Sequence, residues 1–139
     1  MKGEREKIVL CLEDAESRVK FLREIAKSYG ATVYYATRVK EFLMLCSLHS
    51  RADVKAIVLD HDLGDQMPST DTDGLDGLDA AEQMPLIVAP VLIWSLNESG
   101  APRMQQVLRA RGFDPVLQIP FIGYRNEIAK HLRGWLVKT

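Results

Sequence analysis

Five short apolar runs, each followed by a segment with helical periodicity, constrain the fold of this chain more than any other feature. The runs are Lys7–Leu12, Ala31–Ala36, Val54–Asp60, Pro90–Leu96 and Pro115–Ile119. Each run is apolar almost throughout, which is typical of strands buried on both faces of a parallel sheet. Parallel strands also need crossover helices between them. We therefore predict an α/β fold with three layers, in which a parallel sheet lies between two layers of helices.

The segments between and after these runs place apolar residues on one face of a helix. The predicted helices are Ala15–Tyr29, a segment with a Val39, Phe42, Leu43 and Cys46 stripe, Asp76–Met84, Ser99 to Gly112, and Tyr124–Val137. We expect Ser99 to cap the fourth helix, because serine is common at that position. The long polar segment His61–Leu75 contains glycine and proline and is predicted to be a loop.

Length and composition place the chain among ordinary globular proteins. Its 139 residues are the usual size of one domain, so we expect residues 1–139 to form a single domain. The longest apolar run is far shorter than the roughly 20 residues that span a bilayer, and the polar start has no signal-peptide core. Cys11 and Cys46 are predicted to be buried thiols, not a disulfide framework. We expect a cytoplasmic protein with no membrane partner.

Charge is distributed unevenly along the chain, although the net charge is only −1. No lysine or arginine occurs from Ala56 to Pro102. The acidic residues in that stretch are Asp60, Asp62, Asp65, Asp71, Asp73, Asp76, Asp79, Glu82 and Glu98. Such a cluster repels itself unless water or a cation neutralises it. The basic residues after Pro102 are spread over two predicted helices without interleaved aromatic residues, so we read them as a solvated face and expect no DNA recognition.

Polar residues follow three of the predicted strands at the point where each strand ends. The first strand is followed by Glu13-Asp14, the third ends in Asp60-His61-Asp62, and the fourth ends in Ser95-Leu96-Asn97. Ligands bind at the carboxyl ends of the strands in parallel α/β sheets, so we expect these side chains to converge. Converging carboxylates favour a hard cation such as Mg²⁺ or Mn²⁺, and Ser95 and Asn97 are candidates for hydrogen bonds to a phosphoryl group.

On these residues the chain resembles the receiver domain of bacterial response regulators. The resemblance implies a flavodoxin-like (βα)5 fold with strand order 2-1-3-4-5 and a bound Mg²⁺. It also implies that Glu13 and Asp14 hold the metal together with Asp60, and that Asp60 accepts a phosphoryl group. Ser95 corresponds to the hydroxyl residue that senses this group. Three features depart from the pattern. Ile119 stands before Pro120 where receivers carry a lysine, and the loop after Asp60 is longer than in an ordinary receiver. The runs Asp60–Gly64 and Ser95–Met104 are also not typical of receivers.

In these features the chain is similar to a divergent branch of the receiver family, the cyclic-phosphate processing receiver domains. The residues that carry this similarity are the run Asp60-His61-Asp62-Leu63-Gly64 together with Ser95, Asn97, Gly100, Ala101 and Met104. Trp94 replaces the histidine of that second motif. The branch implies an enzyme or binder for cyclic phosphates of nucleotides or RNA ends. For a metal-dependent phosphoesterase of this kind we expect Asp60, His61 and Asp62 to be catalytic, with His61 as the candidate proton carrier because the motif histidine is absent.

Three further interpretations stay open. The chain could be a signalling receiver phosphorylated on Asp60 that passes its state to a partner protein. It could be a pseudo-receiver that binds protein without a metal. Asp60 and Asp62, followed later by Ser95, also match the first two motifs of haloacid-dehalogenase-type phosphatases, in which Asp60 is the nucleophile and Asp62 the acid/base. That reading leaves Glu13 and Asp14 unexplained.

Overall fold

A five-stranded parallel sheet forms the centre of the structure, a computed structural model that describes residues 6–49, 51–63, 74–119 and 125–137. The strands are β1 (Lys7–Leu12), β2 (Ala31–Ala36), β3 (Val54–Leu59), β4 (Val91–Trp94) and β5 (Val116–Ile119). Every neighbouring pair runs parallel, in the order β2-β1-β3-β4-β5. This order confirms the expected 2-1-3-4-5 topology, and β3 and β4 end slightly earlier than the sequence predicted.

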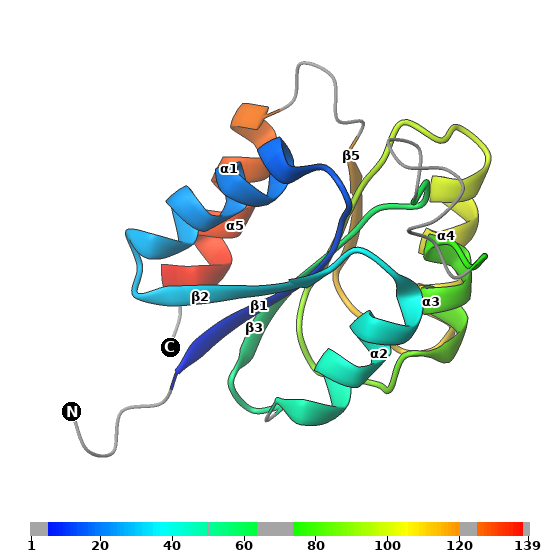
Figure 1. Ribbon diagram of the computed structural model, residues 1–139, viewed down its shortest axis with the longest axis horizontal. Coiled ribbons are helices and arrows are strands. Elements are labelled where there is room, and N and C mark those ends of the chain that lie inside the picture. Colours follow the sequence, from blue (N-terminus) through cyan, green and yellow to red (C-terminus); the bar gives the residue numbers. More distant parts are fainter. Residues whose placement is uncertain (1–5, 50, 64–73, 120–124, 138–139) are drawn as a thin grey trace.

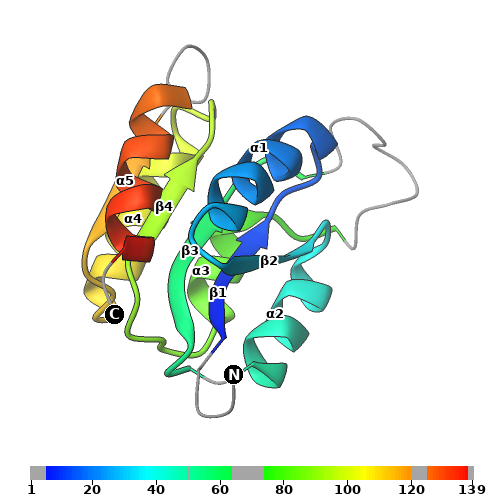
Figure 2. The ribbon, with the colours of Figure 1, turned by 90° about the vertical axis from the view of Figure 1, so that its left-hand side faces the viewer.

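Helices cover both faces of the sheet (Figures 1 and 2). On one face lie α1 (Glu16–Lys27) and α5 (Arg125–Val137), and on the other lie α2 (Val39–Leu48), α3 (Gly77–Gln83) and α4 (Gly100–Ala110). Alternate residues of the central strands point to opposite faces, so the strands contribute to two separate apolar cores. Both faces of β1, β3 and β4 are buried, which explains why these strands are apolar throughout.

The register of the central strands brings the predicted strand ends together. Leu59 pairs with Leu12 on one side and with Ile93 on the other. The backbone N–H of Asp60 donates to the carbonyl of Leu12 at 3.0 Å, so the β1–β3 ladder continues for one residue beyond Leu59. Asp60 therefore lies beside the turn that follows β1.

The starts of α3 and α4 are capped by aspartate and asparagine side chains. Asp76 and Asp79 form a reciprocal capping box at α3. Ser99 occupies the cap position of α4, but its side chain accepts no hydrogen bond from the helix. The prediction that Ser99 lies at the cap position of α4 is confirmed, but Asn97 Oδ1, and not the Ser99 side chain, accepts the backbone N–H groups of Ser99 and Gly100.

The structure also bears on the predictions made for the two cysteines, for membrane-spanning helices and for the loop after β3. Cys11 and Cys46 are free and buried, as expected. Within the described part of the chain, each helix is too short or too polar to cross a membrane. Most of the predicted loop His61–Leu75, including Asp65, lies outside the described residues.

Candidate functional site

Glu13, Asp14 and Asp60 form an acidic pocket at the carboxyl ends of β1 and β3. Each offers one carboxylate oxygen, and these oxygens all lie within 4.8 Å of one another. Glu13 and Asp60 are 1% and 3% exposed, whereas Asp14 is half-buried. The structure thus brings together the three residues that the sequence predicted as metal ligands.

Fixed hydrogen bonds hold the buried members of the pocket. Glu13 Oε2 accepts the backbone N–H groups of Asp14 and Ala15, each at 3.1 Å, in the turn that leads into α1. Asp60 Oδ1 accepts the backbone N–H of His61 at 2.8 Å, and the Asp60 carboxylate also takes a hydrogen bond from the buried hydroxyl residue Ser95. Both carboxylates are therefore positioned before any ligand arrives.

Arg18, in the first turn of α1, supplies a cation that the sequence analysis missed. Its Nη2 lies 3.2 Å from Glu13 Oε2 and its Nη1 lies 3.7 Å from Asp60 Oδ2. The Arg18 side chain is 11% exposed, so the contact with Asp60 is a partly buried ion pair. Arg18 is thus a member of the pocket.

Burial shapes the protonation of the pocket. Desolvation, with the neighbouring charge of Asp60, raises the pKa of Glu13 to about 8, although Arg18 opposes the rise. Desolvation likewise raises the pKa of Asp60 to about 6, against the opposing effects of Arg18 and of the hydrogen bond from Ser95. Both shifts arise because carboxylates that share a desolvated space favour a bound proton or another cation.

The ligand chemistry of the pocket fits a hard divalent cation. Mg²⁺ binds carboxylate oxygens at about 2.1 Å, so ligands on opposite sides of the ion lie about 4.2 Å apart. The three oxygens in the pocket all lie within 4.8 Å of one another, so small side-chain movements would bring them to one ion. With all groups ionised, three carboxylates and one guanidinium carry a net charge of minus two, which one Mg²⁺ or Mn²⁺ neutralises.

His61, Asp62 and Asn97 form a second cluster directly beside the acidic pocket. His61 Nδ1 lies 2.8 Å from Asp62 Oδ1, and Asn97 Nδ2 donates to the same oxygen at 2.8 Å. His61 Nε2 lies 3.5 Å from Asp76 Oδ2, at the cap of α3. Burial would raise the pKa of Asp62, but the hydrogen bonds from His61 and Asn97 lower it. The imidazole thus joins the end of β3 to the start of α3.

Two glycines allow this cluster to pack closely. A Cβ at Gly77 would lie 2.2 Å from the carbonyl oxygen of Asp60, and a Cβ at Gly100 would lie 2.3 Å from Cδ2 of His61. These distances are far below van der Waals contact. The starts of α3 and α4 can approach the end of β3 only because positions 77 and 100 lack side chains.

The Trp94 side chain lies on the face of the sheet that α1 and α5 cover. Its ring is fully buried and packs edge-on against Phe21, with ring centroids 5.8 Å apart. Two guanidinium groups lie over its face, Arg18 at 5.9 Å and Arg125 at 5.8 Å. Among the described residues, the Trp94 indole N–H has no hydrogen-bond acceptor.

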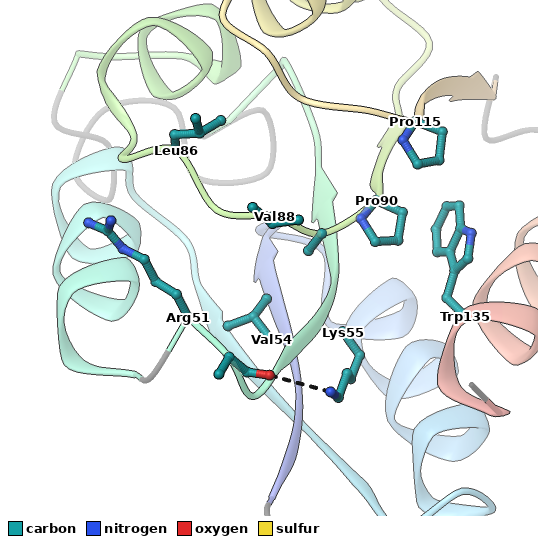
Figure 3. A pocket seen from close by; sticks show the side chains of 10 residues that line it. Arg51, Val54, Lys55, Leu86, Val88, Pro90, Pro115 and Trp135 are labelled. Atoms are coloured by element: carbon teal, nitrogen blue, oxygen red, sulfur yellow. Dashed lines mark hydrogen bonds between the residues drawn. The ribbon is translucent and has the colours of Figure 1, made fainter. Parts of the chain in front are cut away.

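A separate cavity of about 640 Å³ lies at the opposite end of the sheet (Figure 3). It is bordered by the amino-terminal ends of β3, β4 and β5, with Trp135 near Pro90 and Pro115 and with Arg51 across from them. Its lining includes no residue of the acidic pocket or of the His61 cluster.

Comparisons with known proteins show similarity at the level of structure. No protein-family model and no curated protein matches the sequence. Solved receiver structures do match. They include the phosphorylated cyanobacterial phytochrome response regulator RcpA, at 16% identity and a TM-score of 0.64, with 96% of each chain covered. The Mn²⁺-bound response regulator Rcp1 matches at 16% identity and a TM-score of 0.61, again with 96% of each chain covered.

A third match is the receiver domain of the sensor histidine kinase PA1611 from Pseudomonas aeruginosa PAO1. It is 16% identical with a TM-score of 0.61, and the match covers 94% of this chain and 98% of that one. The PA1611 domain is described with a magnesium ion coordinated in its active-site cleft. This chain has the receiver fold. Its acidic pocket lies where the receiver fold places the carboxyl ends of β1 and β3.

Proposed function

We propose that this protein is a metal-dependent phosphoryl acceptor of the receiver type, with Asp60 as the residue that takes the phosphoryl group. The observation that carries the proposal is the convergence of Glu13, Asp14 and Asp60 within 4.8 Å beside Ser95. The solved structures with this fold include one that is phosphorylated and others that hold Mg²⁺ or Mn²⁺. Partner proteins such as a kinase then follow as the source or the readers of the phosphoryl group.

The proposed roles follow from position and chemistry. Glu13, Asp14 and Asp60 hold the metal, which supplies charge neutralisation for an incoming phosphoryl group. An oxygen of Asp60 attacks the phosphorus of a small phosphodonor, the bond from phosphorus to the donor oxygen breaks, and the donor leaves with that electron pair. Ser95 offers a hydroxyl to a phosphoryl oxygen.

The experiment compares the wild type with Asp60→Asn. Each protein is incubated with Mg²⁺ and acetyl phosphate, and intact mass spectrometry follows the added phosphoryl group. We expect an adduct in the wild type that requires Mg²⁺ and is absent in Asp60→Asn. An unmodified wild type that also fails to bind Mg²⁺ in a titration would support the pseudo-receiver instead.

Handling of cyclic phosphates is a second candidate function, and the His61 cluster is the observation that favours it. His61, Asp62 and Asn97 are joined by hydrogen bonds beside Asp60, so an acid/base pair and an amide are available next to a metal site. None of the solved structures named above is described as acting on cyclic phosphates. In this function His61 and Asp62 are catalytic, and Asn97 holds a phosphate oxygen of a nucleotide or an RNA end.

Asp62→Asn separates the two functions. The variant removes the carboxylate that His61 contacts and leaves Glu13, Asp14 and Asp60 in place. Under the receiver function it still forms the adduct with acetyl phosphate. Under the cyclic-phosphate function the wild type opens 2′,3′-cyclic or 3′,5′-cyclic nucleotides and Asp62→Asn does not. A wild type that opens neither ring removes the second candidate.

A further inference from the structure

We propose that Arg18 is the residue that binds the phosphoryl group on Asp60, and that it opposes metal binding at the same site. This inference rests on the proposed phosphoacceptor function. It assigns to α1 a phosphate-binding residue in a site whose other members come from the ends of β1, β3 and β4. The strand next to them, β5, ends at Ile119 and contributes no charge there.

The position of the guanidinium supports this role. Arg18 Nη1 faces Oδ2 of Asp60, whereas Oδ1 of Asp60 is engaged by the backbone N–H of His61. The 3.7 Å separation between Nη1 and Oδ2 is too long for a good hydrogen bond, so the pair interacts mainly by charge. A phosphoryl group on Oδ2 would bring its oxygens to the guanidinium and replace this long contact with charge-assisted hydrogen bonds.

Two neighbours hold the guanidinium in place. Glu13 Oε2 contacts Nη2 at 3.2 Å and is itself fixed by two backbone N–H groups. The face of Trp94 lies below the guanidinium at 5.9 Å, and Trp94 is fully buried. A cation held in this way needs little reorganisation to meet a developing negative charge, which is the condition for strong electrostatic stabilisation.

Because Arg18 is positively charged, it has opposite effects on the binding of the metal ion and of the phosphoryl group. A divalent cation enters beside a positive guanidinium, so Arg18 weakens metal binding by Coulomb repulsion. Phosphorylation replaces the single negative charge of Asp60 with a group that carries about two, so the attraction to Arg18 increases. A purely structural role, as the partner of buried Glu13, predicts instead that removal of Arg18 impairs phosphoryl-group binding and metal binding together.

The test uses Arg18→Gln and Arg18→Lys in the full chain, with Arg23→Gln as the matched control. Arg23 is exposed on the same helix and stacks on Tyr35. Because both residues are arginines, Arg23→Gln changes the net charge of the protein by the same amount as Arg18→Gln. Two quantities are measured: the rate of adduct formation with Mg²⁺ and acetyl phosphate, and the Mg²⁺ dissociation constant by calorimetric titration. Thermal melting verifies that each variant is folded.

We expect Arg18→Gln to form the adduct about 100-fold or more slowly, because removal of one preorganised donor slows a reaction by about 10²–10³-fold. The same variant binds Mg²⁺ with higher affinity, and an unchanged Mg²⁺ affinity would overturn the proposed opposition between Arg18 and the metal. Arg18→Lys keeps the charge, so its Mg²⁺ affinity matches the wild type and its adduct rate lies between those of the wild type and Arg18→Gln. Arg23→Gln matches the wild type in both measurements.

An unchanged adduct rate in Arg18→Gln would overturn the inference while leaving the proposed function intact. Parallel losses of adduct formation and Mg²⁺ affinity would overturn it in favour of a structural role. A wild type without any adduct rejects the proposed function itself. If Arg18→Gln does not fold, Glu13→Gln is compared with Glu13→Gln/Arg18→Gln, in which Glu13 no longer leaves a buried charge without its cation, and the same two measurements decide.

Discussion

The imidazole of His61 lies directly against Gly100, so close that a Cβ at position 100 would come within 2.3 Å of ring atom Cδ2. Gly100 is the first residue of α4, and His61 follows the phosphoacceptor candidate Asp60. The end of β3 and the start of α4 are therefore in contact through a single ring. Substitutions at this contact test how tightly the two elements are coupled.

We predict that Gly100→Ala destabilises the protein by about 1–3 kcal/mol, because the added methyl group forces the His61 ring or α4 to move. Urea denaturation measures the change. Gly134→Ala is the control, since a Cβ there meets nothing within 4 Å on α5, and alanine in a helix should stabilise by about 0.5–1 kcal/mol. Equal unfolding free energies for the two variants would contradict the packing described for His61.

Asn97→Ala should destabilise the protein by about 1–2 kcal/mol through the lost cap of α4. The substitution also removes the donor to Asp62, so the cluster around His61 loosens. Thermal melting compares this variant with Gln106→Ala, which truncates an exposed side chain on the same helix. A melting temperature for Asn97→Ala as high as that of Gln106→Ala would show that Ser99 or water replaces the cap.

In the absence of divalent cations, stability should decrease as pH rises from about 5 to 8. The pKa of Glu13 is raised to about 8 and that of Asp60 to about 6, so the native state binds more protons than the unfolded state in this window. Linkage then lowers the unfolding free energy with rising pH, by at most about 1.4 kcal/mol per pH unit for each extra proton. Denaturation in EDTA at several pH values measures the slope.

Two controls accompany this pH series. Glu13→Gln removes the group with the larger shift and should flatten the slope. Saturating Mg²⁺ should restore stability most strongly near pH 8, where the carboxylates are ionised. A stability that rises with pH in EDTA would contradict the raised pKa values of the pocket.

Asp14→Asn should weaken Mg²⁺ binding by roughly tenfold or more, because a neutral amide replaces one of three carboxylate ligands. Glu24→Gln, an exposed site on α1, makes the same change in net charge away from the pocket. Calorimetric titration of both variants distinguishes direct ligation of Mg²⁺ by Asp14 from a general effect of the protein's net charge. Equal affinities would place the metal elsewhere than between Glu13, Asp14 and Asp60.

The sequence was sufficient to predict the layers of the fold, because strands buried on both faces must be apolar throughout. Strand order depended on family resemblance, since periodicity says nothing about which strands pair. Ligands bind at the carboxyl ends of parallel strands, and this rule predicted that Glu13, Asp14, Asp60 and Ser95 lie close together. The structure agrees with that placement. The functional roles of these residues remain predictions.

Arg18 and the two packing glycines were not predictable in the same way. Arg18 adjoins the apolar stripe of α1, where a charged residue normally points to solvent, and only the docking of α1 over β1 and β3 turns it toward Asp60. From the sequence, Gly100 was singled out only as part of a family motif, and Gly77 lay without further significance inside the predicted helix Asp76–Met84. Their importance depends on the distance between α3, α4 and β3, which no local pattern encodes.

Glu13 links the pocket to the backbone that starts α1. Its Oε2 accepts two backbone N–H groups of the turn and contacts Arg18 at the same time. A ligand that draws Glu13 or Arg18 toward itself must therefore disturb the amide protons of Asp14 and Ala15. Hydrogen–deuterium exchange at these two amides would therefore report occupancy of the site directly.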